Sequence, residues 1–445
     1  MKIALPPKVK QIIQTIHSAG FEAYAVGGCI RDSILGRVPD DWDITTSAKP
    51  EEIKKLFART IDTGIQHGTV TVMLQKEGFE VTTYRIDGEY EDSRHPKEVI
   101  FTACLAEDLQ RRDFTINAMA YNDREGLIDI YDGLKDIEDK VIRCVGEAKE
   151  RFSEDALRIM RAIRFSAQLG YTIDEKTKAA IEELAPNLKN ISAERIQAEL
   201  VKLVISPNPD YLRIAYETGV TAVIFPEFDR MMETEQNNPH HCYCVGEHTL
   251  QAMRHIEGEK VLRLAMLFHD IAKPQMKVVD EDGTYHFHGH PDAGADMTKE
   301  IMKRLKFDND TIGKVTRLVK FHDYYISPSP QGMRRAIFKT GEDIMPYLFK
   351  VKQADMQAQS GYKREEKQKS LESLKDIYRQ VLAQKDCISL KTLAVTGNDL
   401  IASGMKPGKE MGEILNGLLQ LVIEKPECNE KEYLLKQAEG MRSLN

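Results

Sequence analysis

The chain of 445 residues lacks several features that define particular protein classes. It has no apolar run of roughly eighteen residues, so no membrane-spanning helix is expected. Its N-terminal segment lacks the apolar core of a secretory signal, and Pro6–Pro7 instead precedes an amphipathic helical pattern. The seven cysteines are odd in number and form no Cys-x-x-Cys pair, and Cys242 and Cys244 have poor spacing for zinc. A reduced, cytoplasmic setting is therefore expected.

The chain also lacks an excess of positive charge, because 62 Lys and Arg residues face 70 Asp and Glu residues. The net charge of −8 argues weakly against non-specific nucleic-acid binding, for which basic surfaces dominate. Basic residues nevertheless cluster at Arg111–Arg112 and at Arg151, Arg158, Arg161 and Arg164. The length predicts about two to four domains in an ordinary globular protein.

The most informative stretch is AYAVGGCIRDSILGRVPDDWDITT, which carries Gly27–Gly28 and, further on, Asp41 and Asp43. It predicts an apolar strand, a short helix that carries Arg31 and ends at Leu35–Gly36, and a second strand with the two aspartates. Residues i and i+2 of a strand face one side, so both carboxylates would converge and hold Mg²⁺ against a triphosphate. Glycine lets backbone N–H groups approach phosphate oxygens, and a helix N-terminus favours anions.

Each part of this stretch also has a purely structural interpretation, since Asp-x-Asp is common on solvated strand edges and Gly-Gly is usually a turn. The ordered combination favours a nucleotidyl-transfer site. The runs GTVTVMLQ and GFEVTTYR predict a hairpin, and Glu80 in the second run is either a third carboxylate of the site or a solvated strand residue.

Helical periodicity dominates after about residue 140. SEDALRIMRAIRFSAQLG predicts one helix that starts at Ser153 and stops at Gly170, and Ser192 is expected to cap another. The polar segment 87–107 predicts a mobile loop. The expected fold class is therefore α+β, with a mixed β-sheet and helices in an N-terminal head and an all-α remainder.

A later block of helical segments contains an ordered series of histidines and aspartates. The series is His248, His269, Asp270, His290, His322 and Asp355. A single histidine is more often a surface or core residue than a ligand. The order of the series and the adjacent His269–Asp270 pair favour a metal site, since histidine supplies a neutral nitrogen and aspartate a hard oxygen.

Four segments, AVGGCIRDSILGRVPDDWDITT, TTYRIDGEYEDSRHPKEV, RRDFTINAMA and EDALRIMRAIRF, together resemble the ordered motifs of class II CCA-adding enzymes, tRNA nucleotidyltransferases of the polymerase β superfamily. The resemblance covers roughly the first 230 residues and the C-terminal tail. It implies template-independent addition of C, C and A to the tRNA 3′ end from CTP and ATP, with release of pyrophosphate. Asp41 and Asp43, joined by Glu80, would be the catalytic carboxylates and would hold Mg²⁺ in a two-metal transfer.

The resemblance also implies a set of nucleotide-binding residues. They are Gly28, Arg31, Arg112, Asp155, Arg158, Arg161 and Arg164. Asp155 and Arg158 would act as a protein template for the incoming base. A carboxylate accepts from the exocyclic amine of cytosine or adenine and repels the carbonyl of uracil or guanine. Without the upstream motif, an amphipathic helix with a solvated arginine stripe would be the simpler interpretation.

Several alternatives remain open from the sequence. CC-adding relatives lack the loop that here contains Arg85, Asp87 and Arg94, so the loop favours complete CCA addition or A addition alone. Bacterial poly(A) polymerases share the head, but their arginine-rich run after the carboxylate motif is absent here. An alternative of another class treats the head as an inactive RNA-binding remnant and the histidine block as the active hydrolase, and the intact Asp41 and Asp43 count against it.

The run LAMLFHDIAKP resembles the HD superfamily of metal-dependent phosphohydrolases. This resemblance implies phosphodiesterase or phosphatase chemistry with a divalent transition metal such as Mn, Ni, Co or Fe. The additional His290 and His322 suit a two-metal version, and Lys273 could pair with a phosphate. A tRNA end that carries a 2′,3′-cyclic phosphate is one candidate substrate.

The expected domain division follows from these motifs. It comprises a nucleotidyltransferase head (1–140), a neck with the nucleobase-reading helix (141–205), an RNA-binding body (206–244), an HD domain (245–360) and a helical, tRNA-binding tail (361–445). The expected partners are the tRNA 3′ end, CTP and ATP, and no membrane.

Overall fold

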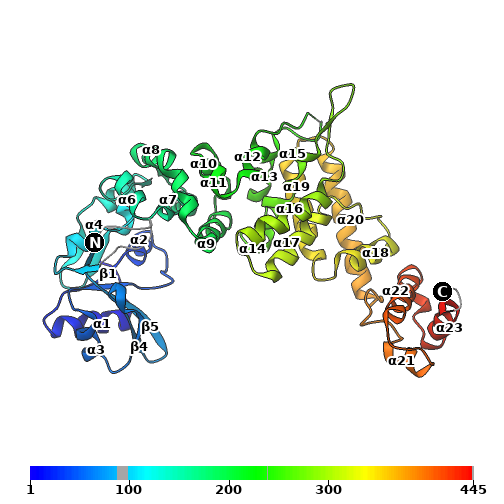
Figure 1. Cartoon of the computed structure of the whole chain (residues 1–445), viewed down its shortest axis with the longest axis horizontal. Helices are drawn as coiled ribbons and strands as arrows, with labels where there is room; N and C mark the ends of the chain where they lie inside the picture. Colours follow the sequence, from blue (N-terminus) through cyan, green and yellow to red (C-terminus); the bar gives the residue numbers. More distant parts are fainter. Residues whose placement is uncertain (88–98, 238, 443–445) are drawn as a thin grey trace. The chain divides into compact units, whose positions relative to one another are not determined.

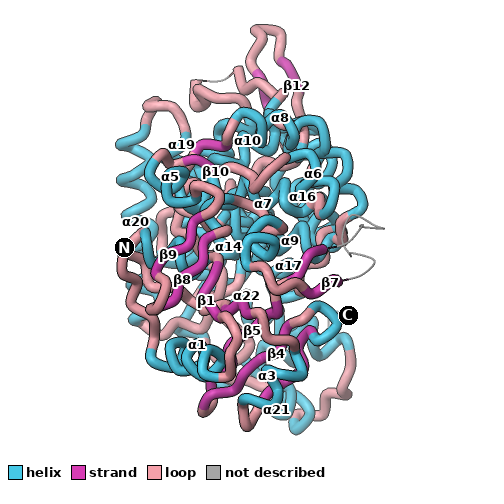
Figure 2. The backbone as a smooth tube through the Cα atoms, turned by 90° about the vertical axis from the view of Figure 1, so that its left-hand side faces the viewer, coloured by secondary structure: helices cyan, strands magenta, loops and turns pink. Residues whose placement is uncertain are grey.

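The computed structural model describes residues 1–87, 99–237 and 239–442. Within these residues the chain divides into two compact units, Met1–Asp229 and Arg230–Asn445. Strands gather in the first unit, whereas the described part of the second is almost entirely helical apart from one short hairpin (Figure 2). The predicted fold class, α+β with a mixed sheet in an N-terminal head and a helical remainder, is confirmed.

A seven-stranded sheet with the order β3-β4-β5-β2-β1-β8-β9 forms the head (Figure 1). Its strands are β1 (Ala23–Val26), β2 (Ile44–Thr46), β3 (Thr60–Gly64), β4 (Thr69–Leu74), β5 (Glu77–Thr83), β8 (Met119–Asn122) and β9 (Gly126–Asp129). The β2–β5 pair is parallel, and the other pairs are antiparallel. All four residues of β1 are buried, as expected for a central strand without polar alternation. The sheet is therefore a rigid base for the loops at its ends.

The N-terminal elements follow the sequence pattern closely. Helix α1 (Pro7–Ser18) has proline at its first position, α2 (Gly28–Ile34) starts at the glycine pair, and α3 (Pro50–Leu56) follows β2. The predicted β4–β5 hairpin is confirmed. The expectation that Asp41 and Asp43 lie within a strand is wrong, because both lie in the loop that precedes β2.

The predicted loop over 87–107 is also partly wrong. Strands β6 (Arg85–Asp87) and β7 (Val99–Phe101) pair antiparallel, and α4 (Leu105–Gln110) begins soon afterwards. Strand pairing is a long-range interaction that the polar composition of this segment conceals. Residues 88–98, which include most of the predicted loop, lie outside the described residues.

The single helix predicted from Ser153 to Gly170 is in fact two helices, α6 (Ala148–Glu154) and α7 (Leu157–Leu169). Asp155 has extended backbone (φ −140°, ψ 102°), and its carboxylate accepts from the Leu157 N–H at 3.0 Å. Ser153 lies inside α6, where its hydroxyl donates to the Lys149 carbonyl. Gly170 ends α7 in the left-handed region as predicted (φ 72°). The break places Asp155 between two helices.

The first unit contains six further described α-helices, two of which, Ala193–Val204 and Leu212–Glu217, pack on α7. The six are α5 (Gly133–Glu138), α8 (Glu175–Leu184), α9 (Ala193–Val204), α10 (Leu212–Glu217), α11 (Val220–Ile224) and α12 (Pro226–Met232), the last of which reaches into the second unit. Strands β10 (Val141–Ile142) and β11 (Thr172–Ile173) form a short parallel pair. Helix α9 begins directly after Ser192, as the sequence predicts, but the Ser192 side chain forms no capping hydrogen bond.

The second unit begins with a bundle built around the buried helix α14. The bundle contains α13 (Val245–Arg254), α14 (Lys260–Phe268), α15 (Lys273–Met276), α16 (His290–Arg304), α17 (Asn309–Phe321), α18 (Pro330–Thr340), α19 (Met345–Ala358) and α20 (Arg364–Ala383), with a hairpin of β12 (Val278–Val279) and β13 (Tyr285–His286). Helices α21 (Gly397–Ala402), α22 (Lys409–Glu424) and α23 (Lys431–Arg442) enclose a separate apolar cluster. None of the helices in the described ranges has the length and apolar character needed to cross a membrane.

Candidate functional site

Three predicted carboxylates meet at one end of the head sheet. The parallel register pairs Ile44 with Val81, which places the preceding residues Asp43 and Glu80 side by side. A hollow of about 760 Å³ is lined by Asp41, Asp43 and Glu80. Partial desolvation, Asp41 and Glu80 raise the pKa of Asp43, whereas Arg112 opposes the rise. A bound divalent cation would relieve this repulsion, so the three oxygen donors fit Mg²⁺.

A glycine turn lies beside these carboxylates. Gly27 has a positive φ of 87°, and its N–H donates to the Met119 carbonyl. A Cβ at Gly27 would lie 3.1 Å from the Arg112 guanidinium, so glycine allows this close approach. Helix α2 then starts at Gly28. The start of α2 and Arg112 thus lie beside the place where a triphosphate would lie against the carboxylates.

A buried polar chain links α2 to α7. Arg31 donates to the Asn117 side chain at 2.7 Å, Asn117 donates to Asp113 at 3.2 Å, and Arg161 donates to Asp113 at 2.8 Å. Burial alone would raise the pKa of Asp113, but Arg161 and the hydrogen bonds outweigh it and lower the pKa to about 2. Asp113 therefore binds Arg161 directly and Arg31 through Asn117, while Arg31 also pairs with Asp32 at 2.8 Å.

Three predicted arginines surround a single aromatic ring. The guanidinium carbons of Arg31, Arg161 and Arg164 lie 5.1, 5.4 and 3.7 Å from the centre of the Phe165 ring. Arg164 also forms a buried ion pair with Glu199 of α9 at 2.6 Å. Burial lowers the pKa of Arg164 to about 10, although Glu199 opposes this. Phe165 and Glu199 therefore also belong to the candidate site, although no motif in the sequence predicts either residue.

The two residues predicted to read the base have different partners. The Asp155 carboxylate accepts from Arg195 of α9 at 2.7 Å. The Arg158 guanidinium donates to Glu154 at 2.6 Å and to the Arg111 carbonyl at 2.9 Å. The backbone nevertheless keeps them adjacent, since the Arg158 N–H donates to the Asp155 carbonyl. Arg195 joins the site from forty residues further along the chain, and no local signal in the sequence predicts it.

In the second unit, the six predicted metal ligands converge from different helices. His248 lies in α13, His269 and Asp270 follow α14, His290 begins α16, His322 follows α17 and Asp355 lies in α19. All of them are buried except Asp355, which is half-buried. The Nδ1 atoms of His269 and His322 donate to carbonyls at the ends of their helices, those of Met266 and Val319, at 2.7 Å each. Helix ends have free carbonyls, which explains how two of the rings are oriented.

Asp270 lies between two groups of ligand atoms. Its Oδ2 is 3.2 Å from His269 Nε2 and 3.7 Å from His248 Nε2, and Asp355 Oδ1 is 2.9 Å from His248 Nε2. Its Oδ1 is 3.4 Å from His290 Nε2 and 3.6 Å from His322 Nε2. Each group offers three ligand atoms within 4.8 Å of one another. One carboxylate could thus bridge two metal ions.

The histidine hydrogen bonds support a cation between the rings. His290 donates Nδ1–H to the Phe287 carbonyl at 2.8 Å, and His322 donates Nδ1–H to Val319. With these tautomers both Nε2 atoms are acceptors, yet they lie 3.2 Å apart. Two facing acceptors need a proton or a metal ion between them, and buried Nε2 atoms oriented by carbonyls are typical metal ligands. The donor set fits a divalent transition metal.

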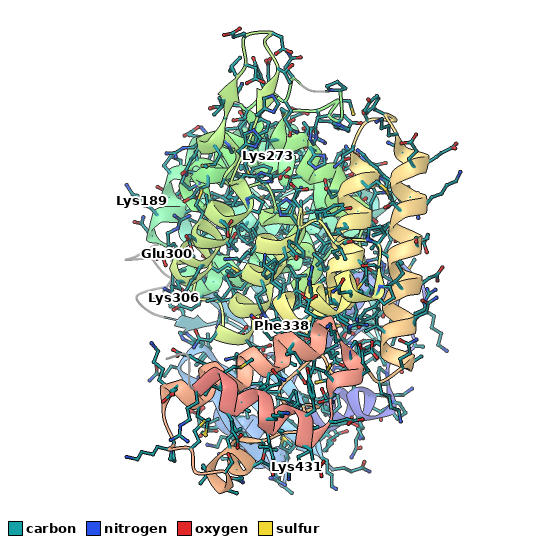
Figure 3. All side chains as sticks on the ribbon, turned by 90° about the vertical axis from the view of Figure 1, so that its right-hand side faces the viewer. Lys189, Lys273, Glu300, Lys306, Phe338 and Lys431 are labelled. Atoms are coloured by element: carbon teal, nitrogen blue, oxygen red, sulfur yellow. The ribbon has the colours of Figure 1, made fainter. Side chains whose placement is uncertain are left out.

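Lys273 lies beside this cluster (Figure 3). Its ammonium group is 2.7 Å from Asp270 Oδ2 and also donates to the Gln236 side chain at 2.8 Å. Burial alone would raise the pKa of Asp270, but His269 and Lys273 outweigh it and hold the pKa well below its ordinary value. A fifth histidine that the sequence analysis did not select, His241, packs edge-to-face on His248 with ring centres 5.2 Å apart.

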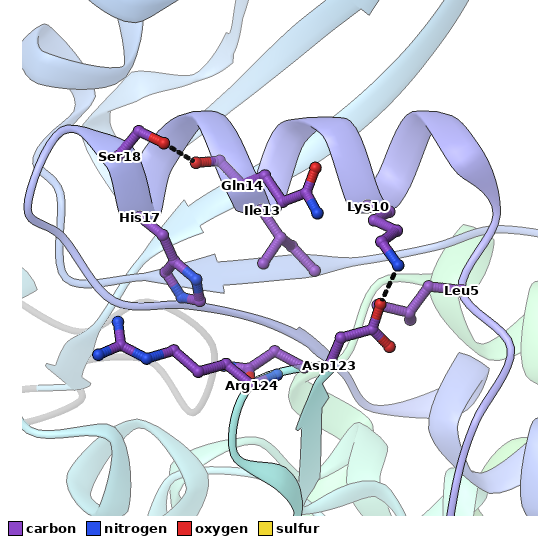
Figure 4. A pocket seen from close by; sticks show the side chains of 9 residues that line it. Leu5, Lys10, Ile13, Gln14, His17, Ser18, Asp123 and Arg124 are labelled. Carbon is purple, nitrogen blue, oxygen red and sulfur yellow. Dashed lines mark hydrogen bonds and ion pairs between the residues drawn. The ribbon is translucent and has the colours of Figure 1, made fainter.

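A further hollow of about 600 Å³ lies at the opposite end of the head sheet, beside α1 (Figure 4). Lys10 forms an ion pair with Asp123 at 2.6 Å, and the Ser18 hydroxyl donates to the Gln14 carbonyl. Among the described residues that line it, Asp123 is the one carboxylate, and it already has a cationic partner. This hollow does not match the predicted chemistry.

Three family models match the chain. One, described as "Poly A polymerase head domain", covers residues 23–143. A second, described as "Probable RNA and SrmB- binding site of polymerase A", covers 170–232. A third, for domain 2 of tRNA nucleotidyltransferases, covers 292–438. The first match contains the carboxylates and the glycine turn described above.

Relatives are similar to this chain over nearly their whole length. The CCA-adding enzyme of Lactobacillus helveticus is 36% identical over 435 residues, which are 98% of this chain and 97% of that protein. The CCA-adding enzyme of Enterococcus faecalis is 36% identical over 436 residues, which are 97% and 95% of the two chains.

Solved structures are similar over the same extent. The Bacillus stearothermophilus CCA-adding enzyme in complex with CTP has a TM-score of 0.74 and 30% identity, and the match covers 99% of this chain and 100% of that chain. The Thermotoga maritima CCA-adding enzyme complexed with tRNA_CCA has a TM-score of 0.58 at 20% identity, a likeness that shows the fold alone.

Proposed function

This chain belongs to the CCA-adding enzymes, and on that premise we propose that it adds C, C and A to the 3′ end of tRNA from CTP and ATP without a nucleic-acid template. The observation that carries the proposal is the meeting of Asp41, Asp43 and Glu80 at one end of the sheet, beside the glycine turn and Arg112. Three oxygen donors next to a phosphate-binding turn are what nucleotidyl transfer requires.

Asp41 and Asp43 hold Mg²⁺ in this proposal, and Glu80 completes the acidic wall. When bound, the metal stabilises charge on the triphosphate and favours attack by the RNA 3′-hydroxyl on the α-phosphorus, with pyrophosphate as the leaving group. The backbone at Gly27–Gly28 and the Arg112 guanidinium orient the phosphates. The chain itself therefore supplies orientation and charge, the main requirements of phosphoryl transfer.

The nucleobase is selected in this proposal by Asp155 and Arg158. The half-buried Asp155 carboxylate accepts from the exocyclic amine that cytosine and adenine share, and repels the carbonyl of uracil or guanine. Arg195 orients that carboxylate through its hydrogen bond. Arg31, Arg161 and Arg164 support the nucleotide from the polar chain around Phe165.

Incorporation of labelled CTP and ATP into tRNA transcripts that lack CCA tests this function. Wild type should add all three nucleotides, and Asp41→Asn or Asp43→Asn should lower the rate about 1000-fold, equivalent to about 4 kcal/mol. Asp139→Asn, on an exposed aspartate that does not line this hollow, is the control and should stay within about twofold. Full activity of Asp41→Asn would refute the assignment.

The same assay separates the related alternatives. Addition of ATP alone, and only to tRNA that ends in CC, would identify an A-adding enzyme. Long A tracts on RNA of any sequence would identify a poly(A) polymerase. Absence of incorporation together with phosphoesterase activity would favour a hydrolase with an inactive head.

We also propose a second function, metal-dependent phosphoester hydrolysis by an HD domain in the second unit. The observation that favours it is Asp270, whose two oxygens each face a separate pair of histidines. The six ligands would hold Mn, Ni, Co or Fe ions, which supply Lewis-acid stabilisation and an activated water when bound. Lys273 is placed to pair with a phosphate oxygen.

Metal analysis by mass spectrometry tests this second function. We expect about two transition-metal ions per chain after incubation with Mn²⁺, and hydrolysis of a generic phosphoester. His269→Ala and Asp270→Ala should lose both properties and keep nucleotide addition. His255→Ala, an exposed histidine outside the cluster, is the matched control. A chain that takes up no metal would refute the HD assignment.

We propose that the five-part division into head (1–140), neck (141–205), body (206–244), HD domain (245–360) and tail (361–445) describes these functions. The division between the compact units at Asp229 falls inside the proposed body. A cytoplasmic location is proposed because the reaction uses CTP, ATP and tRNA. Deletion of 361–445 should weaken tRNA binding in a filter-binding assay if the tail binds tRNA, and unchanged affinity would refute that role.

A further inference from the structure

Two hollows meet at the histidine–aspartate cluster of the second unit. The first, of about 280 Å³, lies against the β12–β13 hairpin, and we call it the narrow hollow. The second, of about 590 Å³, lies against α20, and we call it the wide hollow. Both are lined by the ligands His322 and Asp355 and by three further shared residues, His241, Asp323 and Gln359. A group bound at the cluster can therefore extend in two directions.

The narrow hollow combines aromatic surface with nitrogen donors. Tyr285 and Phe287 line it, and so do Lys273, His286 and His288. The rings of His286 and His288 are stacked, with centres 5.4 Å apart and planes at 7°. A flat aromatic base or ring fits such a surface, because stacking on an aromatic face contributes about 1–3 kcal/mol per base.

The wide hollow combines apolar and cationic groups. Met356, Leu371 and Leu374 line it together with three lysines, Lys352, Lys363 and Lys367. Three acidic residues, Asp323, Asp355 and Glu366, also line this hollow. Its volume lies within the range of small-molecule sites, about 300–1,000 Å³.

The ammonium groups of two of these lysines are held by hydrogen bonds. Lys352 donates to the His322 carbonyl at 2.7 Å, and Lys367 donates to Gln359 at 2.6 Å. Oriented cations beside an apolar wall suit an organic group that carries a phosphate.

We propose that the HD cluster cleaves acyclic phosphodiesters between two nucleosides, with one ester group in each hollow. This inference rests on the phosphohydrolase function proposed above. A phosphomonoester has a single organic group and would occupy one hollow, whereas a diester has two organic groups on one phosphorus. The shared lining by His322 and Asp355 places the phosphorus where the hollows meet.

The reaction is a hydrolysis that needs only water besides the diester. One P–O bond forms to the water oxygen, and the P–O bond to the leaving group breaks. The water proton passes to the leaving oxygen. The products are one phosphomonoester and one alcohol, with no change in oxidation state.

The test compares substrates on the full chain in Mn²⁺. We expect ApA and bis(p-nitrophenyl) phosphate to be hydrolysed at least about tenfold faster than AMP, p-nitrophenyl phosphate or 2′,3′-cyclic AMP. A short RNA beside ApA identifies whether the diester comes from RNA or from a dinucleotide. Hydrolysis of monoesters or the cyclic nucleotide alone would overturn this inference and leave the phosphohydrolase function standing. No hydrolysis of any substrate would overturn both.

A pair of variants isolates the wide hollow. Ser370 lines it, whereas Ser373, one turn along the same helix and also exposed, does not. Ser370→Trp should fill the hollow and lower diester hydrolysis at least about tenfold with little effect on p-nitrophenyl phosphate. Ser373→Trp should match wild type. Equal diester rates for the two variants would overturn the proposal.

A binding measurement gives a readout that does not depend on turnover. Calorimetric titration with a phosphorothioate-linked dinucleoside, which is hydrolysed slowly, should show a binding event in wild type and Ser373→Trp. Ser370→Trp should lose that event. Retention of the event in Ser370→Trp would overturn the assignment of the second ester group to the wide hollow.

Discussion

At the scale of single residues, the proposed selection of the base would depend on Asp155 acting as a hydrogen-bond acceptor. Both of its oxygens already have defined donors, the Leu157 N–H and Arg195, so the carboxylate has one orientation toward a bound base. The helix break between α6 and α7 leaves this side chain half-buried between the two helices. A change in hydrogen-bonding character at Asp155 should therefore change nucleotide choice more than it changes the fold.

Asp155→Asn is expected to raise the ratio of UTP to CTP incorporation by about 10- to 100-fold, because an amide N–H₂ can donate to the uracil carbonyl that a carboxylate repels. Competition between labelled UTP and CTP on tRNA transcripts measures this ratio. Asp139→Asn, on an exposed aspartate outside the site, should leave the ratio unchanged. Unchanged selectivity in Asp155→Asn would contradict a base-reading role.

At the scale of secondary-structure elements, Asp113 lies in the turn that precedes β8, and its carboxylate accepts from Arg161 of helix α7. Its pKa in the folded protein, about 2, is below the ordinary value of 3.8. The ionised form therefore stabilises the folded state above about pH 4, and this stabilisation is lost as the pH falls toward 2. The difference corresponds to about 2 kcal/mol.

Between pH 4 and about pH 2, the free energy of unfolding should therefore fall in both proteins, but the fall in wild type should exceed the fall in Asp113→Asn by about 2 kcal/mol. Urea denaturation at a series of pH values, followed by circular dichroism, measures the two slopes. Parallel pH profiles for the two proteins would show that Asp113 does not carry this linkage.

The contact between α7 and α9 depends on the buried pair of Arg164 and Glu199. Glu199→Ala would leave the Arg164 guanidinium buried without its carboxylate, which we expect to cost about 3–5 kcal/mol of unfolding free energy. Glu182→Ala, on the exposed face of α8, serves as control and should change it by less than about 0.5 kcal/mol. A loss below 1 kcal/mol in Glu199→Ala would mean that the Phe165 ring alone compensates the charge.

At the scale of the whole molecule, the two proposed sites lie in different compact units. If the proposed HD cluster binds metal, binding would stabilise only the state in which its helices are assembled, by about 2.7 kcal/mol when the metal concentration is a hundred times the dissociation constant. These helices are α13, α14, α16, α17 and α19. Chelation should therefore raise amide hydrogen exchange in these helices and leave β1 and α7 unchanged.

Hydrogen-exchange mass spectrometry with and without a chelator measures this response helix by helix. Asp270→Ala should exchange at the chelated rate under both conditions, because it loses the ligand shared by both groups. A chelator response that is equal in both units would contradict independent sites.

Local pattern was enough to predict the elements whose residues are neighbours in the chain. The proline start of α1, the β4–β5 hairpin, the glycine turn before α2 and the Gly170 stop of α7 depend on backbone preferences within a few residues. The convergence of the six predicted metal ligands agrees with their order in helical segments. The sequence by itself therefore determined which side-chain chemistry is present and the local secondary structure that orients these side chains.

The tertiary structure alone decided which side chains meet. Arg195 donates to Asp155, which precedes it by 40 residues, and Glu199 forms an ion pair with Arg164. Each oxygen of Asp270 faces a different pair of histidines, and the four histidines come from four helical segments. The helix break at Asp155 and the pairing of β6 with β7 also depend on distant partners. Long-range contacts form only when whole helices and strands pack together, so no local segment of the sequence determines them.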